Sequence, residues 1–188
     1  IRDFAPGVPV EVNIDNTVAA VAACWLTGEM DADIARGAMA SYMGPKRRFE
    51  LRWEENIPGG RVIVDDYAHH PEELRASILS MRKLYPGRKL SVAFQPHLYS
   101  RTRDFAPQFA EALSLADEVV MISLYPAREE PIPGISSKTI LDLISGPEKL
   151  LIDKEDFAKT IKKRNFEILL TAGAGDLPDY IPALIKEL

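Results

Sequence analysis

Residues 62–71, which read V-I-V-D-D-Y-A-H-H-P, constrain the fold more than any other stretch of this sequence. Three apolar residues that favour a β-strand lead directly into two carboxylates, a tyrosine and two histidines, and Pro71 suits the first turn of a following helix. In α/β sheets, ligands bind beyond the carboxyl ends of the strands. The stretch therefore predicts an α/β sheet with a functional site where this strand ends.

The three histidines of the chain are concentrated near this predicted strand end. His69 and His70 belong to the stretch above, and His97 follows the next predicted strand in F-Q-P-H. Parallel neighbouring strands would bring all three to one edge of the sheet. Because histidine titrates near neutral pH, we favour a polar site that handles protons or phosphate over three unrelated loop caps.

Strands and helices alternate regularly from residue 48 to the end of the chain. Two alternating segments, 48–53 and 61–64, flank a turn and predict a β-hairpin. The later alternation predicts a mostly parallel, Rossmann-like α/β sheet with helices on both faces. The remaining expected strands are 89–94, 118–124, 149–152 and 167–170, and the expected helices are 71–84, 102–115, 136–144, 155–163 and 179–187.

The part of the chain before residue 45 has a different pattern. Residues 10–14 alternate like a short strand. A helix that is apolar nearly all round is expected over 17–26, with Asp15 or Asn16 as its N-cap. A second helix is expected over 31–42.

Two helices are too few for an independent core, so we expect residues 1–44 to be the incomplete tail of a preceding domain. The segment G-P-K at 44–46 marks the expected boundary, and 45–188 is expected to form a separate α/β domain. The sequence starts without an initiator methionine, which indicates a piece of a longer protein.

Composition narrows the class of protein. With 46% hydrophobic and 27% charged residues, the sequence is typical of a globular protein. A net charge of −5 without a long Lys/Arg run argues against nucleic-acid binding, and no stretch approaches the roughly 20 apolar residues needed for membrane insertion. Cys24 is the only cysteine, which excludes an intrachain disulfide and suits a cytoplasmic protein.

The residues of D-D-Y-A-H-H each have a structural and a functional interpretation. Asp65 and Asp66 would contact a ribose or a metal-bound water, or would only cap the loop, and the residues alone leave both open. Tyr67 and His69 are two apart and point the same way if the segment stays extended. His70 would then face the core.

The loop F-Q-P-H-L-Y-S-R-T-R adds His97, Arg101 and Arg103 at the start of a predicted helix. A helix N-terminus attracts anions through its free N–H groups, and an arginine there can hold a carboxylate or phosphate with two parallel hydrogen bonds. This position favours a binding role for Arg101. Arg103 is better explained as a surface arginine that pairs with Asp104 or Glu111.

The segment T-A-G-A-G-D, residues 171–176, lies between a predicted strand and a predicted helix. It lacks the lysine and the spacing of a Walker phosphate loop. We therefore interpret Gly173 and Gly175 as tight-turn glycines that let the backbone approach a neighbour or a ligand. Because no other stretch matches a Walker loop, the chain has no obvious phosphate-binding loop for a nucleoside triphosphate.

Four motifs occur in order along the chain: D-D-Y-A-H-H-P, F-Q-P-H-x-Y-S-R-T, Y-P-A-x-E-x-P-I-x-G and G-A-G-D. Together they resemble the carboxy-terminal domain of the Mur ligases, and the resemblance covers nearly all of the chain. The doubled histidine with F-Q-P-H is most similar to the members that add L-alanine, and the muropeptide-recycling members are the nearest competitor. A nucleotide- or sugar-binding α/β module without catalysis also stays open, because such sheets host many functions.

The resemblance implies an ATP-dependent ligase that joins L-alanine to UDP-N-acetylmuramate through an acyl phosphate, in peptidoglycan precursor synthesis. It implies ATP and Mg²⁺ as cofactors, with the phosphate loop and the metal ligands in a central domain and the UDP-sugar contacts in an amino-terminal domain. The segment V-N-I-D-N-T-V-A-A resembles the end of that central domain. The two missing domains are therefore expected partners, and this chain alone is expected to be inactive.

The resemblance also implies nucleotide contacts, by motif position. Asn13 and Asn16 would meet the adenine. Arg48 and one of the two carboxylates, Asp65 or Asp66, would meet the ribose or its neighbourhood.

By the same motif positions, the resemblance also implies which residues lie near the reacting groups. Tyr67 and His69 would lie near the reacting phosphate and the amino acid, as the catalytic residues. His97 and Arg101 would bind the substrate beside the alanine. No metal ligand is implied in this chain.

Three positions depart from the pattern of the family. Val12 stands where many members have histidine, and Leu98 stands where arginine is expected in F-Q-P-H-R. Arg128 replaces the usual glycine in Y-P-A-G-E. The departure at Leu98 removes one cation from the implied carboxylate site, and Arg128 is a candidate to compensate for it.

Overall fold

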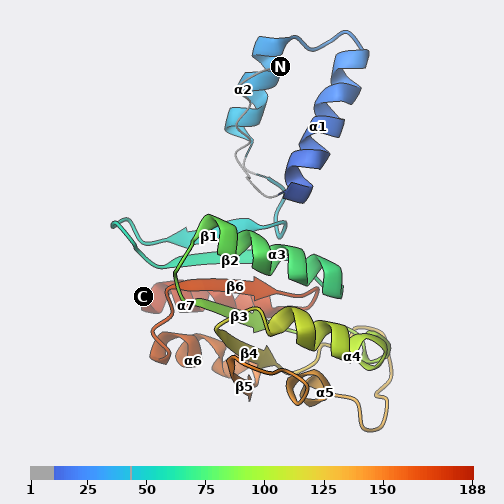
Figure 1. The fold of residues 1–188 in the computed structure, drawn as a ribbon, viewed down its shortest axis with the longest axis vertical. Coiled ribbons are helices and arrows are strands. Elements are labelled where there is room, and N and C mark those ends of the chain that lie inside the picture. Colours follow the sequence, from blue (N-terminus) through green and yellow to red (C-terminus); the bar gives the residue numbers. More distant parts are fainter. Residues whose placement is uncertain (1–10, 43) are drawn as a thin grey trace. The chain divides into compact units, whose positions relative to one another are not determined.

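The computed structural model describes residues 11–42 and 44–188 and divides the chain into two units, Ile1–Glu50 and Leu51–Leu188 (Figure 1). The first unit contains helices α1 (Glu11–Leu26) and α2 (Ala32–Ser41). Asp31 caps α2, because its side chain accepts hydrogen bonds from the backbone N–H groups of the first turn. The assignment of this unit to the tail of a preceding domain stays a prediction.

The start of α1 corrects two expectations. The expected strand at 10–14 is wrong, since α1 already begins at Glu11, while Val10 lies outside the described residues. Asp15 and Asn16 are helical residues and not N-caps. No proline or glycine interrupts 11–26, and helix propagation adds one hydrogen bond per residue, so the helix continues through both polar side chains.

The second unit is built on a six-stranded sheet in the order β1-β2-β6-β3-β4-β5. The strands are β1 (Glu50–Glu54), β2 (Val62–Asp66), β3 (Leu90–Phe94), β4 (Glu118–Ile122), β5 (Glu148–Ile152) and β6 (Ile168–Ala172). Strands β2, β6, β3, β4 and β5 pair in parallel. A short turn joins β1 to β2, which makes this edge pair an antiparallel hairpin. The predicted, mostly parallel α/β sheet is confirmed.

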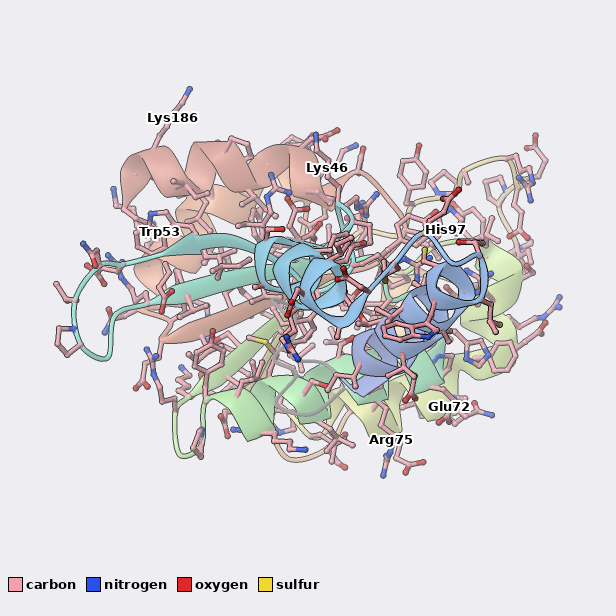
Figure 2. The ribbon with its side chains drawn as sticks, turned by 90° about the horizontal axis from the view of Figure 1, so that it is seen from above. Lys46, Trp53, Glu72, Arg75, His97 and Lys186 are labelled. Atoms are coloured by element: carbon pink, nitrogen blue, oxygen red, sulfur yellow. The ribbon has the colours of Figure 1, made fainter. Side chains whose placement is uncertain are left out.

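Helices cover both faces of the sheet (Figures 1 and 2). On one face lie α3, α4 and α5, and on the other lie α6 and α7. Every residue of β3, β4 and β6 is buried, as expected for strands covered on both sides. The helices are α3 (Pro71–Leu84), α4 (Tyr99–Leu113), α5 (Ser137–Leu141), α6 (Phe157–Lys163) and α7 (Ile181–Glu187), with short 3-10 turns at Lys154–Asp156 and Leu177–Tyr180.

Helix α4 begins three residues earlier than the sequence predicted, at Tyr99 rather than Thr102. Its N-cap is Leu98, whose backbone has a φ of 72° and whose side chain makes no capping hydrogen bond. The carbonyl of Leu98 accepts hydrogen bonds from the Thr102 N–H and hydroxyl. The earlier start places Arg101 inside the first turn of the helix.

At the amino-terminal end of the parallel strands, an ion-pair network surrounds one buried carboxylate, that of Glu118. Glu118, the first residue of β4, is 0% exposed and accepts a 2.6 Å hydrogen bond from the Ser91 hydroxyl. Arg164 bridges Glu118 and Glu148, and Lys89 Nζ lies 3.7 Å from Glu118 Oε2. The buried charge of Glu118 needs these partners, because a buried carboxylate without them would destabilise the fold. No helix in the described residues is long and apolar enough to cross a membrane.

Candidate functional site

The carboxyl ends of three adjacent strands define the candidate site. In the sheet register, Asp66 at the end of β2 and Phe94 at the end of β3 both align with Ala172 at the end of β6. The chain leaves β3 towards α4 on one face and leaves β6 towards α7 on the other, which is the arrangement that opens a ligand crevice. Figure 2 shows His97 at this end of the sheet and Trp53 at the opposite end.

The buried side chain of Gln95 joins the loops that follow β3 and β6. Gln95 is 1% exposed, donates to Asp176 Oδ1 at 2.9 Å and accepts from the Leu177 N–H at 3.0 Å. Gly173 has a φ of 131°, and a Cβ on Gly175 would lie 2.2 Å from Gln95 Oε1. The two glycines therefore let the loop pack directly on Gln95, which confirms them as close-approach glycines against a neighbouring residue.

The two aspartates at the end of β2 make contacts within the second unit. Asp65 is 1% exposed, accepts a 2.6 Å hydrogen bond from the Thr171 hydroxyl and has Arg52 Nη1 at 3.9 Å from its Oδ2. Asp66 accepts a hydrogen bond from the Ser77 hydroxyl on α3. These contacts tie β2 to β6 and to α3, and the ribose contact stays a prediction.

Tyr67 and His69 lie together, as their spacing predicts. Their rings meet edge to face with centroids 5.1 Å apart. His69 Nδ1 lies 3.0 Å from the Tyr67 carbonyl oxygen and 3.3 Å from Glu73 Oε2. Two acceptors beside Nδ1 favour the tautomer with its proton on that nitrogen, which leaves Nε2 for a ligand.

His70 has a different role from the predicted core histidine. It is half-buried and caps α3, with Nδ1 accepting from the Glu72 N–H at 3.4 Å. Its ring lies edge-on to Phe105, with centroids 5.1 Å apart. The free N–H groups of the first helical turn need a hydrogen-bond acceptor. The His70 imidazole provides one, and it therefore lies at the helix start rather than in the core.

His97 and Arg101 carry unsatisfied polar atoms. His97 Nδ1 and Arg101 Nη1 are buried and lack a hydrogen-bond partner within the described residues. The His97 ring stacks on Tyr125, with centroids 5.8 Å apart and an interplanar angle of 12°. Burial, followed by the positive charges of Arg101, His69 and Arg128, lowers the pKa of His97 below its ordinary value.

These two atoms indicate what the site binds. Leaving a polar atom buried without a partner costs roughly 1–3 kcal/mol, and more for a charged group, so a ligand that supplies acceptors is favoured there. Arg101 stands in the first turn of α4, where the helix dipole also attracts negative charge. The arrangement therefore suits an anionic group such as a carboxylate or a phosphate.

Sequence reasoning missed three residues around this site: Gln95, Tyr125 and Glu129. Glu129 accepts the Ser100 N–H at 2.9 Å and also binds the Ser100 hydroxyl. The signal was available, because polar residues follow β4 just as they follow β2 and β3, and β4 is the neighbour of β3. Arg103, by contrast, pairs with Asp104 at 2.7 Å, which confirms one of its two expected partners.

The other predicted site residues belong to the first unit. Asn13 lies in α1, and Asn16 and Arg48 are exposed. Their nucleotide contacts stay predictions. No group of three or more His, Cys, Asp or Glu side chains in the described part of the chain has the spacing to hold a metal ion.

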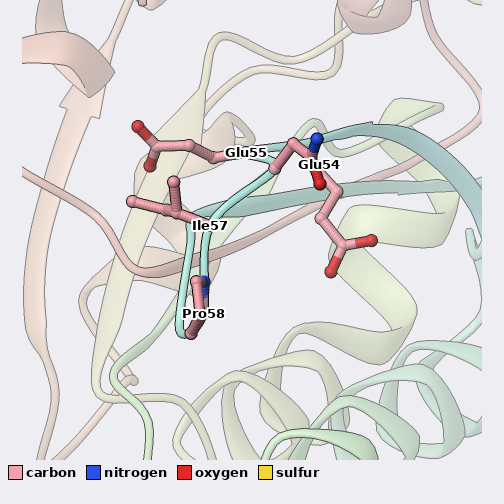
Figure 3. A pocket seen from close by; sticks show the side chains of 5 residues that line it. Glu54, Glu55, Ile57 and Pro58 are labelled. Atoms are coloured by element: carbon pink, nitrogen blue, oxygen red, sulfur yellow. The ribbon is translucent and has the colours of Figure 1, made fainter.

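A hollow also lies at the hairpin turn, away from these residues (Figure 3). It is lined by Glu54, Glu55, Asn56, Ile57 and Pro58. Its two carboxylates repel anions, and Glu55 is already paired with Arg61 at 3.1 Å. This hollow therefore does not suit the anionic ligand that the strand-end site favours.

Together, these features define a doubly wound α/β domain with a candidate anion site at the carboxyl ends of its strands. The chain belongs to the Mur ligase family, since the family model described as "Mur ligase, glutamate ligase domain" matches residues 47–176. A UDP-N-acetylmuramate–L-alanine ligase of Parabacteroides distasonis is 49% identical over 100% of this chain and 40% of that protein.

Two solved structures are similar to this fold. The crystal structure of a UDP-N-acetylmuramate–alanine ligase from Thermotoga maritima has a TM-score of 0.80 and 27% identity, over 98% of this chain and 39% of that one. A murein peptide ligase from Psychrobacter arcticus has a TM-score of 0.62 and 21% identity, over 93% of this chain and 36% of that one, and it supports the fold alone. The chain thus spans about 40% of the length of the curated relative that it matches.

Proposed function

We propose that this chain is the carboxy-terminal part of a cytoplasmic, ATP-dependent ligase that joins L-alanine to UDP-N-acetylmuramate. Mur ligases depend on ATP, usually with Mg²⁺, and the relative from Parabacteroides distasonis bears the name of this activity. The observation that carries the proposal is the buried Nη1 of Arg101, which has no partner among the described residues and suits a carboxylate.

Arg101 would bind the carboxylate of L-alanine. The planar guanidinium matches a carboxylate with two parallel hydrogen bonds, and its place in the first turn of α4 adds the attraction of the helix dipole. His97 has a lowered pKa and is therefore neutral near pH 7. A neutral imidazole next to Arg101 adds a hydrogen bond without repelling the ammonium form of the incoming amino acid.

His69 and Tyr67 would lie near the reacting groups. Glu73 and the Tyr67 carbonyl hold His69 through Nδ1, which orients Nε2 and leaves it for the substrate. A positioned imidazole of this kind can accept the proton that the alanine amine loses as it attacks the activated carboxyl group.

ATP would supply the phosphoryl group that activates the muramic carboxylate. The proposed contacts of this chain to the nucleotide are Asn13, Asn16, Arg48 and Asp65 or Asp66. The proposed Mg²⁺ ligands and phosphate loop lie in other domains of the same protein. This chain alone is accordingly proposed to be inactive, because its sequence has no Walker loop to neutralise the charge of a transferring phosphoryl group.

The test is the Arg101→Ala variant of the full-length protein, with Arg103→Ala as the matched control. Arg101→Ala should raise the KM for L-alanine by about 10²-fold, equivalent to about 2–3 kcal/mol for a charge-assisted contact, and leave the KM for ATP nearly unchanged. Arg103 pairs with Asp104 at the surface, so its removal should change neither KM.

An unchanged KM for L-alanine in Arg101→Ala, or an equal rise in both KM values, would contradict the proposed role of Arg101. ATP turnover by the wild-type protein with a muropeptide in place of L-alanine would indicate a recycling ligase. No amino-acid-dependent phosphate release with any substrate would indicate a binding module.

A further inference from the structure

The loop that follows β4 lies directly against the loop that carries His97. The backbones join at two hydrogen bonds: the Leu98 N–H donates to the Tyr125 carbonyl at 3.1 Å, and the Tyr125 N–H donates to the Pro96 carbonyl at 2.9 Å. The rings of Tyr125 and His97 stack above this pairing. The two loops are therefore one connected structure, and residues just after Tyr125 belong to the surroundings of the site.

Glu129 fixes the next part of this loop to the start of α4. Its carboxylate accepts the Ser100 N–H at 2.9 Å, and its own N–H donates to the Pro126 carbonyl at 3.0 Å, which closes a turn over 126–129. Leu98, the N-cap of α4, has no side-chain acceptor, so Glu129 supplies the one that the helix start needs. The turn that contains Arg128 is thereby held beside the first turn of α4.

Arg128 is a cation without an ion-pair partner in the described part of the chain. It is exposed, and within the described ranges 11–42 and 44–188 no carboxylate lies within ion-pair distance of its guanidinium. The carboxylate of Glu129, its sequence neighbour, is bound to Ser100 instead. The positive charge of Arg128 lowers the pKa of His97, after the larger effects of burial, Arg101 and His69, so the guanidinium acts on the same imidazole as Arg101.

We propose that Arg128 is a second binding residue for the carboxylate of the amino-acid substrate and that it acts together with Arg101. This inference rests on the proposed function, because it takes the anion at Arg101 to be that carboxylate. Leu98, which follows His97 directly, offers no charge, so the second cation comes from the loop after β4. The exposure of Arg128 implies a smaller contribution than that of the half-buried Arg101, since water screens an exposed charge and its side chain loses more freedom on binding.

The experiment compares the full-length protein with three variants: Arg128→Ala, Arg101→Ala and the double variant Arg128→Ala/Leu98→Arg. Arg128→Ala should raise the KM for L-alanine about tenfold and change the KM for ATP less than twofold. The rise should shrink as ionic strength increases, because salt screens an exposed cation more than a buried one. The double variant should recover most of the lost affinity, since Leu98→Arg returns a guanidinium next to His97.

The results separate this inference from the proposed function. If Arg101→Ala raises the KM for L-alanine but Arg128→Ala leaves it within twofold of the wild type, Arg128 is not a second binding residue for the carboxylate. The proposed function then stands. If neither variant changes that KM, the anion site is not the amino-acid site, and the role proposed above for Arg101 fails as well. Equal rises in the KM for L-alanine and for ATP in Arg128→Ala would overturn the assignment of Arg128 to the carboxylate.

Discussion

The two units of the chain use apolar residues in opposite ways. In the first unit, α1 leaves Leu26 87%, Val18 56% and Trp25 46% exposed, although the helix is largely apolar. In the second unit, every residue of β3, β4 and β6 is buried. Apolar composition alone does not make a core, because an apolar helix surface is stabilised only when a second layer covers it.

The second unit closes its own core with two layers of helices. Its central cluster joins strand residues such as Ile63 and Leu169 to helix residues such as Phe157 and Ile181. In the described part of the first unit, the buried side chains are Thr17, Ala35, Met39 and Phe49. We therefore expect the second unit to carry most of the folding free energy of this chain.

The largest expected effect comes from matched Leu→Ala substitutions in the two units. Leu169, in the centre of β6, is 0% exposed, so Leu169→Ala should lower the free energy of unfolding by about 2–5 kcal/mol. Leu26→Ala should change it by less than about 0.5 kcal/mol, as for other exposed positions. Urea unfolding of both variants measures the difference, and equal losses would break the contrast between the units.

A smaller effect is expected from matched Gly→Ala substitutions. A Cβ on Gly175 would lie 2.2 Å from Gln95 Oε1 and 3.0 Å from Tyr125 Cβ, so Gly175→Ala should destabilise the second unit by about 1–3 kcal/mol. Gly37 in α2 has nothing within 4 Å of such a Cβ, and Gly37→Ala should stabilise that helix by up to about 1 kcal/mol.

Thermal unfolding measures the first of these changes, and hydrogen exchange of the α2 amides measures the second. A Gly175→Ala protein as stable as the wild type would mean that Gln95 moves without loss, and the tight packing of T-A-G-A-G-D on Gln95 would not be needed for the fold.

The smallest effect is the pH dependence that His97 gives to the second unit, where all three histidines lie. Burial and Arg101 lower its pKa in the folded state from the ordinary 6.5. Between that lowered pKa and 6.5, the unfolded state binds more protons, so the free energy of unfolding should fall as the pH drops through this range. His97→Gln should remove this part of the fall.

Urea unfolding of the wild type and His97→Gln at a series of pH values between about 7 and 5 tests this sign. Identical pH slopes in the two proteins would show that His97 titrates alike in the folded and unfolded states, and that its surroundings do not disfavour the charged form.

Local patterns predicted the elements of the second unit well because their causes act within a few residues. Helix α3 begins at Pro71 and ends at Leu84, as the sequence predicted, with acids in its first turn and Arg82 and Lys83 in its last. The same local signals failed for α1, where Asp15 and Asn16 looked like caps. An N-cap residue is needed only where a helix begins. The sequence does not distinguish a polar residue inside a helix from the same residue type at the N-cap.

The site was predictable in outline and not in its contacts. The sequence alone placed His69, His97 and Arg101 at one end of a parallel sheet, since residues that follow adjacent parallel strands share an edge. It also determined that Arg101 stands near a helix start. It did not determine which polar groups would be satisfied within the fold.

Only the tertiary structure decided those partners. Gln95 and Asp176 are 81 residues apart in the sequence, and Ser100 and Glu129 are 29 apart. These pairs nevertheless decide that Gln95 joins the loops after β3 and β6 and that Glu129 caps α4. Each polar group in the site has several possible partners along the chain, and the sheet order selects among them. The order β2-β6-β3-β4 brings these loops together, and it leaves the Nη1 of Arg101 without a partner among the described residues.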